Sequence, residues 1–198
     1  MNGKTSSFAG FVFGRRGTLL ALPALGLAVL GKPSAFSIAV GLPLAFAGEA
    51  IRAWAVGYSG VTTRSDTVEA PALVTAGPYA YVRNPLYVGN FVTATGFALA
   101  YTGANKPLTR AAIVAASLGV MLGVYAVIIP HEEAFLQTAF GEAFEEYRSS
   151  VPRIFPALEP AAQQSGSYDP SVIGRAESRT FITLGAMLAA LAFKALQA

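Results

Sequence analysis

The sequence predicts an all-α integral membrane protein: a bundle of about five transmembrane helices with a cytoplasmic amphipathic helix. Three features of its composition support this fold class. Hydrophobic residues make up 54% of the 198 residues, charged residues make up only 13%, and the mean hydropathy is +0.50. A soluble domain carries about 25% charged residues, so this chain has too little charge to cover a surface in water. The same low polarity excludes a disordered chain. The length suits a single domain over residues 1–198.

Five apolar segments are candidates for membrane spans. They are residues 17–31, 34–58, 86–101, 111–130 and 181–196. The fourth has no formal charge over about twenty residues, enough to cross a hydrocarbon core of about 30 Å. The first is short and contains Pro23, and basic residues precede it, so a signal peptide is the alternative interpretation. No convincing cleavage site follows it, and another apolar run begins at once, which favours a span.

Small residues recur at helical spacing within these segments. Gly89, Thr93 and Gly96 share a face of the third span, and Gly119 and Gly123 form a small-xxx-small pair in the fourth. Such faces let helices approach closely. We expect these faces to pack against other helices of the bundle or to form a homodimer contact. A further pair, Gly10 and Gly14, carries the same expectation.

Lysine and arginine are distributed unevenly between the two sides of the predicted bundle. With the N-terminus inside, nine of them fall in cytoplasmic segments and four on the opposite side. The excess predicts a cytoplasmic N-terminus in the cell (inner) membrane. The two long polar stretches, residues 59–85 and 131–179, then lie together on the cytoplasmic side. The cytoplasmic residues are Lys4, Arg15, Arg16, Arg64, Arg83, Arg148, Arg153, Arg175 and Arg179.

The second polar stretch begins as an amphipathic helix. Leu136, Phe140, Phe144 and Tyr147 recur at helical spacing, opposite a face of glutamates. This pattern predicts a helix that lies at the interface or packs under the bundle. Pro152 is expected to end it. A polar loop and an additional C-terminal span over residues 180–197 complete the chain.

The composition also excludes several kinds of site. With no cysteine and a single histidine, His131, we expect no metal site. The basic residues do not cluster, so we expect no nucleic-acid partner. No Gly-x-Gly-x-x-Gly follows a predicted strand, so the sequence does not support a soluble Rossmann-type enzyme.

Two sequence blocks carry a family resemblance. Residues 73–89 have the pattern Leu-Val-x-x-Gly-x-Tyr-x-x-x-Arg-Asn-Pro-x-Tyr-x-Gly, and about 45 residues later come Glu132-Glu133, Phe140-Gly141 and Tyr147. In this order and spacing the blocks resemble the isoprenylcysteine carboxyl methyltransferase family, part of a wider group that includes phospholipid N-methyltransferases. The resemblance covers residues 48–156.

The resemblance implies a cytoplasm-facing pocket for S-adenosylmethionine that caps a lipid-open tunnel for an apolar substrate. It implies catalytic positions at Arg83 and Asn84, although an asparagine cannot shuttle protons. Arg83 is expected to order the turn at Asn84 or to contact the cofactor carboxylate, with membrane anchoring as the alternative. The implied cofactor-binding residues are Leu73, Val74, Tyr79, Asn84, Pro85, Tyr87, Glu132 and Glu133. Glu133 is also compatible with a solvated helix face, because adjacent helix positions point about 100° apart.

The acceptor is expected to differ from that of the isoprenylcysteine enzymes. Those enzymes carry a substrate-contacting arginine four residues before the first glutamate, where this chain has Ile128. Glu49 and Arg52 lie on one helical face within the second span, where charges are costly. We predict that they bind the substrate; a self-satisfied ion pair is the alternative.

The resulting hypothesis is S-adenosylmethionine-dependent methyl transfer to a lipophilic acceptor from the bilayer, such as an isoprenylcysteine-like carboxylate, a lipid or a small amphiphile. Two alternatives remain at this stage. Sterol reductases share a related fold but use NADPH, and a non-enzymatic transport or scaffold subunit would also explain the apolar composition.

Overall fold

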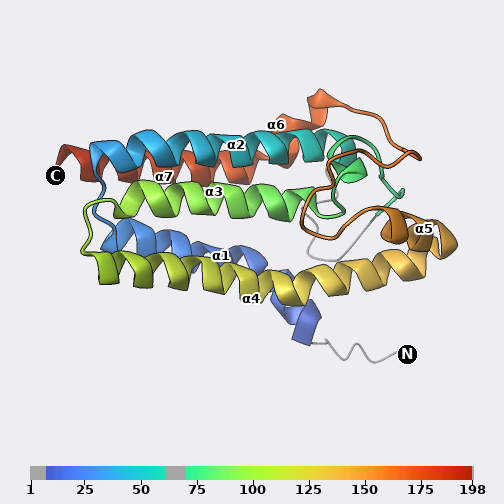
Figure 1. Ribbon diagram of the computed structural model, residues 1–198, viewed down its shortest axis with the longest axis horizontal. Coiled ribbons are helices and arrows are strands. Elements are labelled where there is room, and N and C mark those ends of the chain that lie inside the picture. The colour runs from blue at the N-terminus through green and yellow to red at the C-terminus, as the bar shows by residue number, and fades with distance from the viewer. Residues whose placement is uncertain (1–7, 61–69, 198) are drawn as a thin grey trace.

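The computed structural model describes residues 8–60 and 70–197, and throughout these ranges the regular structure is helical. Five long helices run side by side along the molecule (Figure 1). They are α1 (Phe8–Leu30), α2 (Ala35–Ser59), α3 (Pro85–Thr102), α4 (Pro107–Phe140) and α7 (Ser178–Leu196). The short elements are η2 (Gly77–Ala80), α5 (Glu142–Ser150), η3 (Pro170–Val172) and α6 (Ile173–Ala176). The predicted all-α membrane bundle is confirmed.

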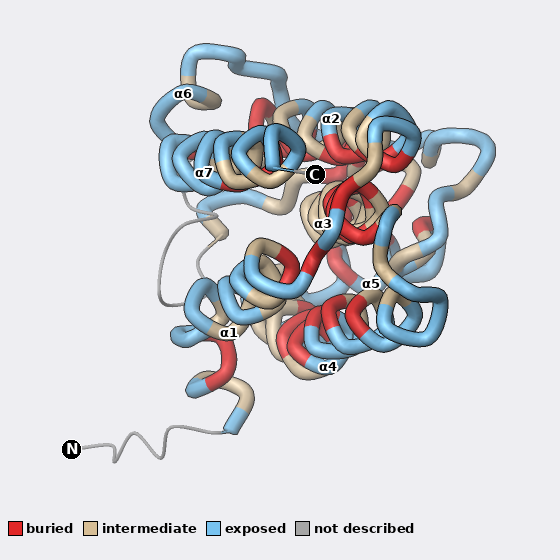
Figure 2. Tube along the Cα trace, turned by 90° about the vertical axis from the view of Figure 1, so that its left-hand side faces the viewer, coloured by how far each residue is buried: buried red, intermediate tan, exposed pale blue. Residues whose placement is uncertain are grey.

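Four of the described helices, α1, α2, α4 and α7, are long and apolar enough to cross a membrane. The fifth predicted span is α3, which has 18 residues and lies among the other four (Figure 2). Large apolar side chains on the outer surfaces remain exposed, including Leu25 of α1, Leu122 of α4 and Ile182 of α7. Such surfaces suit a lipid environment better than water.

All the long polar connections lie at one end of the bundle. The described part of the α2–α3 connection, residues 70–84, lies with α5 and much of the segment that follows α5 at the right-hand end of Figure 1, and the first residues of α1 point toward the same end. The two predicted polar stretches therefore share an end, as far as the structure describes them. Lys4 and Arg64, which entered the orientation argument, lie outside the described residues.

Helices α2 and α3 pack through small residues. A Cβ added to Gly48 would collide with Thr93 of α3, and one added to Gly96 would collide with the backbone of α2 at Ala45. The predicted packing face on α3 is thus confirmed, because only glycine permits this backbone approach. In contrast, a Cβ on Gly119 or Gly123 would meet open space, so this pair serves no contact within the described chain.

Helix α4 continues ten residues beyond the expected end of the span. Pro130 lies inside the helix, and Gly141, with φ of +54°, separates α4 from α5. An internal proline removes one backbone hydrogen bond, and the burial of Ile128, Ile129 and Glu133 holds the surrounding turns in the bundle. The expected amphipathic segment is therefore split: its first turns extend α4, and Phe144 of α5 is buried beneath them.

Candidate active site

A single large cavity of about 1000 Å³ opens into the polar end of the described bundle. Its polar end includes Tyr79 of η2 and Glu132 of α4, and its walls continue between the helices to Leu27, Phe97 and Met187 in the apolar core. Ligand pockets typically enclose 300–1,000 Å³. The cavity is therefore large enough for a cofactor together with part of a second, apolar molecule.

Ten of the eleven site residues predicted from the sequence line this cavity. They are Glu49, Arg52, Leu73, Val74, Tyr79, Arg83, Asn84, Pro85, Tyr87 and Glu132. Residues separated by more than eighty positions thus meet at one surface. The exception is Glu133, which does not line the cavity.

The first motif block forms the wall around Tyr79. Gly77, with φ of +62°, begins η2, and a side chain there would collide with the Tyr58 ring. The backbone carbonyl of Tyr79 accepts a hydrogen bond of 2.8 Å from the Tyr147 hydroxyl of α5. Burial raises the pKa of Tyr79 to about 12. Its phenol therefore stays protonated at neutral pH and can donate a hydrogen bond.

Glu132 presents a carboxylate to the cavity. The Tyr87 hydroxyl donates a hydrogen bond of 2.7 Å to Glu132 Oε1, which orients the carboxylate. Within residues 8–60 and 70–197, no arginine or lysine forms an ion pair with it. A half-buried carboxylate without a cationic partner is suited to a ligand that brings positive charge.

The neighbouring carboxylate, Glu133, faces the opposite way. Its oxygens accept from Arg83 Nε at 3.0 Å, Arg153 Nη2 at 2.6 Å and Asn84 Nδ2 at 3.3 Å. We call these four residues the Glu133 cluster. Because Glu133 is buried and doubly paired outside the cavity lining, the cofactor contact expected for it gives way to a structural role. The separation of Glu132 and Glu133 follows from the rotation of about 100° per helical residue.

The catalytic positions expected at Arg83 and Asn84 are also occupied by internal contacts. Arg83 Nη1 donates to the Arg148 carbonyl at 2.9 Å and to the Val151 carbonyl. Asn84 Nδ2 donates to the Arg153 carbonyl at 3.1 Å. Both side chains thus tie the beginning of α3 to the segment after α5. The geometry favours a positioning role for them, consistent with ordering of the Asn-Pro turn.

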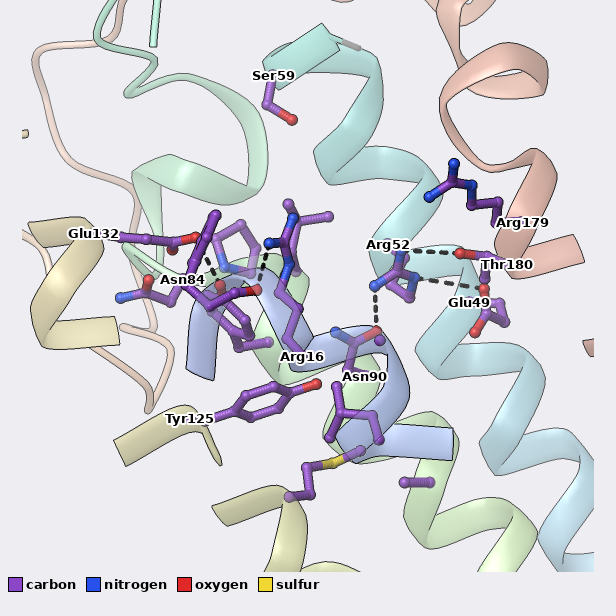
Figure 3. Close-up of a pocket in the computed structure, with 18 of the residues that line it drawn as sticks. Arg16, Glu49, Arg52, Ser59, Asn84, Asn90, Tyr125, Glu132, Arg179 and Thr180 are labelled. Carbon is purple, nitrogen blue, oxygen red and sulfur yellow. Dashed lines mark hydrogen bonds and ion pairs between the residues drawn. The ribbon is translucent and has the colours of Figure 1, made fainter. Parts of the chain in front are cut away.

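A second charged group lies in the cavity wall, and we call it the Arg52 cluster. Arg52 Nη2 donates to both Glu177 oxygens, at 2.9 and 2.8 Å, and to Thr180 Oγ1 at 3.3 Å. Its Nη1 donates to Asn90 Oδ1, and its Nε lies 3.6 Å from Glu49 (Figure 3). Both Nη nitrogens therefore have hydrogen-bond partners in the protein, whereas the buried Nε has none among the described residues and makes only the ion-pair contact with Glu49. These contacts favour the ion-pair alternative, with Glu177 as a partner in addition to Glu49, and substrate binding by Arg52 stays a prediction.

Five lining or supporting residues escaped the sequence analysis as site residues. They are Arg16, Asn90, Tyr125, Glu177 and Thr180. Asn90 and Tyr125 carried a signal, because polar side chains inside apolar spans often face a cavity. Glu177 carried none, since it lies in a polar loop 125 residues away from Arg52.

Comparison with known proteins identifies relatives over the same part of the chain. A nickel-cobalt-cadmium resistance protein, NccN, of Alcaligenes xylosoxydans xylosoxydans is 38% identical over 43% of this chain and 37% of its own length. The protein-S-isoprenylcysteine O-methyltransferase of Schizosaccharomyces pombe is 36% identical over 43% of this chain and 34% of its own length. A probable protein-S-isoprenylcysteine O-methyltransferase of Oryza sativa subsp. indica is 32% identical over 61% of each chain. No solved structure matches.

These alignments span between a third and two thirds of the length of the relatives. A family model described as phospholipid methyltransferase matches residues 36–143, more than half of the chain. The matched region contains nearly all of α2 together with α3 and α4, and it includes both motif blocks except Tyr147 of α5. The chain therefore belongs to the phospholipid methyltransferase family of membrane methyltransferases, and the resemblance to the isoprenylcysteine enzymes is confirmed.

Proposed function

We propose that this protein transfers a methyl group from S-adenosylmethionine to a lipophilic acceptor within the cavity, at the cytoplasmic face of the cell membrane. The observation that carries the proposal is the polarity of the cavity. One end presents Glu132, which has no ion-pair partner in the part of the chain that the structure describes, and the other reaches apolar side chains between the helices, including Leu27 and Met187. The two ends match a charged cofactor and an apolar acceptor.

The residues present fit the proposed cofactor. S-adenosylmethionine supplies an electrophilic methyl group on a sulfonium cation, together with an amino group and ribose hydroxyls. Glu132 would accept hydrogen bonds from the amino or ribose groups, and the protonated Tyr79 phenol would donate one. The ring of Tyr87 lies in the same wall and could face a cation, a contact worth about 0.5–2 kcal/mol.

The chemistry requires alignment more than acid–base catalysis. Methyl transfer is an in-line displacement: the bond from carbon to the acceptor forms while the carbon–sulfur bond breaks, and its electron pair stays on sulfur. Holding the two reactants in line can contribute about 7–11 kcal/mol. The cavity walls would provide that alignment and exclude water. A carboxylate acceptor needs no base, whereas a hydroxyl or amine must lose a proton.

Calorimetric titration of the purified protein with S-adenosylmethionine tests this proposal. The wild type should bind, and Glu132→Gln should weaken binding roughly tenfold to a hundredfold, the effect expected for losing a hydrogen bond to a charged group. Glu142→Gln is the matched control, because Glu142 is exposed on α5 and away from the cavity.

Parallel titration with NADPH distinguishes the reductase alternative. Binding of NADPH in place of S-adenosylmethionine would overturn the proposal, as would a wild type that binds neither. A tritiated-methyl transfer assay on membrane extract would then identify the labelled acceptor.

A further inference from the structure

We infer that residues 157–169 form the outer wall of the S-adenosylmethionine site, with Ser167 against the bound cofactor and Thr75 as the residue that positions this wall. We call residues 157–169 the strap. The inference rests on the proposed methyl transfer and adds to the site a segment outside residues 36–143, the region that the family model matches. The strap follows α5 and lies at the same end of the bundle as η2 (Figure 1).

Two residues of the strap line the cavity. Gly166 and Ser167 contribute to the lining together with Leu73, Val74 and Tyr79, three of the cofactor-binding residues expected from the sequence. Gly166 has a φ of +120°, which favours glycine, and a Cβ added there would lie 3.2 Å from Val74 Cγ1. The backbone of the strap therefore lies directly beside the first motif block.

Backbone hydrogen bonds hold the first half of the strap along η2. The Ala157 N–H donates to the Tyr81 carbonyl, and the Ala161 N–H donates to the Ala80 carbonyl, each at 2.9 Å. Ala161 also packs against the buried group that contains Phe144 of α5. The strap is thus joined to the same short helix that carries Tyr79.

Thr75 makes the connection next to the lining residues. The Ser165 carbonyl accepts from the Thr75 N–H at 2.9 Å and from the Ala76 N–H at 3.1 Å, and the Ser165 N–H donates in return to Thr75 Oγ1 at 2.8 Å. Thr75 is only 8% exposed, so these bonds are shielded from water. Because Ser165 immediately precedes Gly166 and Ser167, Thr75 acts as a positioning residue for both.

Helix α2 holds the other end of the strap. The Asp169 N–H donates to the Gly57 carbonyl at 2.8 Å, and the rings of Tyr168 and Tyr58 lie 5.4 Å apart. A Cβ added to Gly57 would collide with the Tyr168 ring, so glycine permits this close contact. Ser167 is therefore fixed from both sides at an exposed part of the cavity lining. Its hydroxyl can donate and accept hydrogen bonds, which suits the amino and ribose groups of the cofactor.

The absence of cysteine from the sequence allows a direct test on the full-length protein. Ser167→Cys places one thiol in the proposed wall, and Ser171→Cys is the matched control, exposed in η3 and outside the cavity lining. Maleimide labelling of each variant is followed by intact mass spectrometry, which also distinguishes a methylated thiol. S-adenosylmethionine at about 100 times its Kd leaves about 1% of the protein unliganded, so it should slow labelling of Ser167→Cys about tenfold or more. Labelling of Ser171→Cys should not change.

Thr75→Val tests the positioning role. Valine keeps the shape of the side chain but removes the oxygen that accepts from the Ser165 N–H. Calorimetric titration should show S-adenosylmethionine affinity weakened roughly threefold to tenfold, the effect expected for one hydrogen bond. In the Ser167→Cys background, Thr75→Val should also reduce the protection of the thiol by saturating cofactor. Thr75→Ser keeps the hydroxyl and should restore both affinity and protection, which a role in stability alone would not predict for the thiol.

The outcomes separate this inference from the proposed function. Calorimetric binding of S-adenosylmethionine with unchanged labelling of Ser167→Cys overturns the strap as part of the site and leaves methyl transfer standing. Loss of cofactor binding in Ser167→Cys alone, with Ser171→Cys unaffected, supports the contact. Equal affinity and protection in Thr75→Val and wild-type backgrounds overturns the role of Thr75. A wild type that does not bind S-adenosylmethionine overturns the methyl-transfer proposal and this inference together.

Discussion

The Glu133 cluster and the Arg52 cluster are both buried groups of opposite charges, yet they connect different parts of the molecule. The first ties the beginning of α3 to α4 and the segment after α5; Arg83 and Asn84 reach the cavity lining, whereas Glu133 does not. The second ties α2 to the beginning of α7 and forms part of the cavity wall. Glu177 and Thr180 lie beyond the region that the family model matches. The comparison shows that a motif carboxylate, Glu133, supports the site from behind its lining, while residues outside the region matched by the family model also form part of the cavity wall.

The largest effect should follow from breaking the Arg52 cluster. Arg52→Leu removes the cation that pairs with Glu49 and with the buried carboxylate of Glu177, and breaking a buried ion pair typically costs about 3–5 kcal/mol of unfolding free energy. Arg52→Leu combined with Glu177→Leu should recover part of this loss, because an apolar pair replaces the charges. Thermal and denaturant unfolding of both variants measures the effect. A single variant as stable as wild type would contradict the burial of this ion pair.

Removing Glu133 should have a somewhat smaller effect. Glu133→Ala leaves the buried Arg83 without its carboxylate, but Arg83 keeps its bonds to two backbone carbonyls, and Arg153 is half exposed. We expect a loss of about 2–3 kcal/mol, measured by unfolding, with S-adenosylmethionine affinity of the folded protein unchanged. If the variant instead retained its stability and lost cofactor affinity, Glu133 would belong to the cofactor site after all.

The smallest effect should come from the exposed pair of Arg148 and Glu145 on α5. The two side chains lie 2.8 Å apart but are about half exposed. Exposed ion pairs contribute about 0–1 kcal/mol. Glu145→Ala should therefore shift the unfolding free energy by about 0.5 kcal/mol or less and leave cofactor binding unchanged. A larger loss of unfolding free energy would mean that this exposed ion pair stabilises the protein as much as the two buried clusters do.

The helices were predictable because membrane spans depend on local composition. Helices α3 and α7 begin and end within a few residues of the expected limits. The end of α4 was not predicted, because the span was expected to stop with the apolar run at residue 130, whereas the helix continues to Phe140. Most lining residues were predictable through the two motif blocks, but the direction of each side chain was not. Glu132 and Glu133 are adjacent and differ only in the direction in which they point from the helix axis. Which of the two directions faces the cavity is decided by how α4 packs against neighbouring helices.

The sequence by itself determined a membrane-embedded helical methyltransferase with its charges confined to a few positions. Shortage of charge and the length of apolar runs are local properties, and the two blocks identify the family without any contact information. Only the tertiary structure decided which of the few charges are available to a ligand. Arg52 is paired with Glu177 across 125 residues and Arg83 with Glu133 across 50, whereas Glu132 has no ion-pair partner within residues 8–60 and 70–197. Such pairings depend on the approach of distant helices, and no local pattern encodes them.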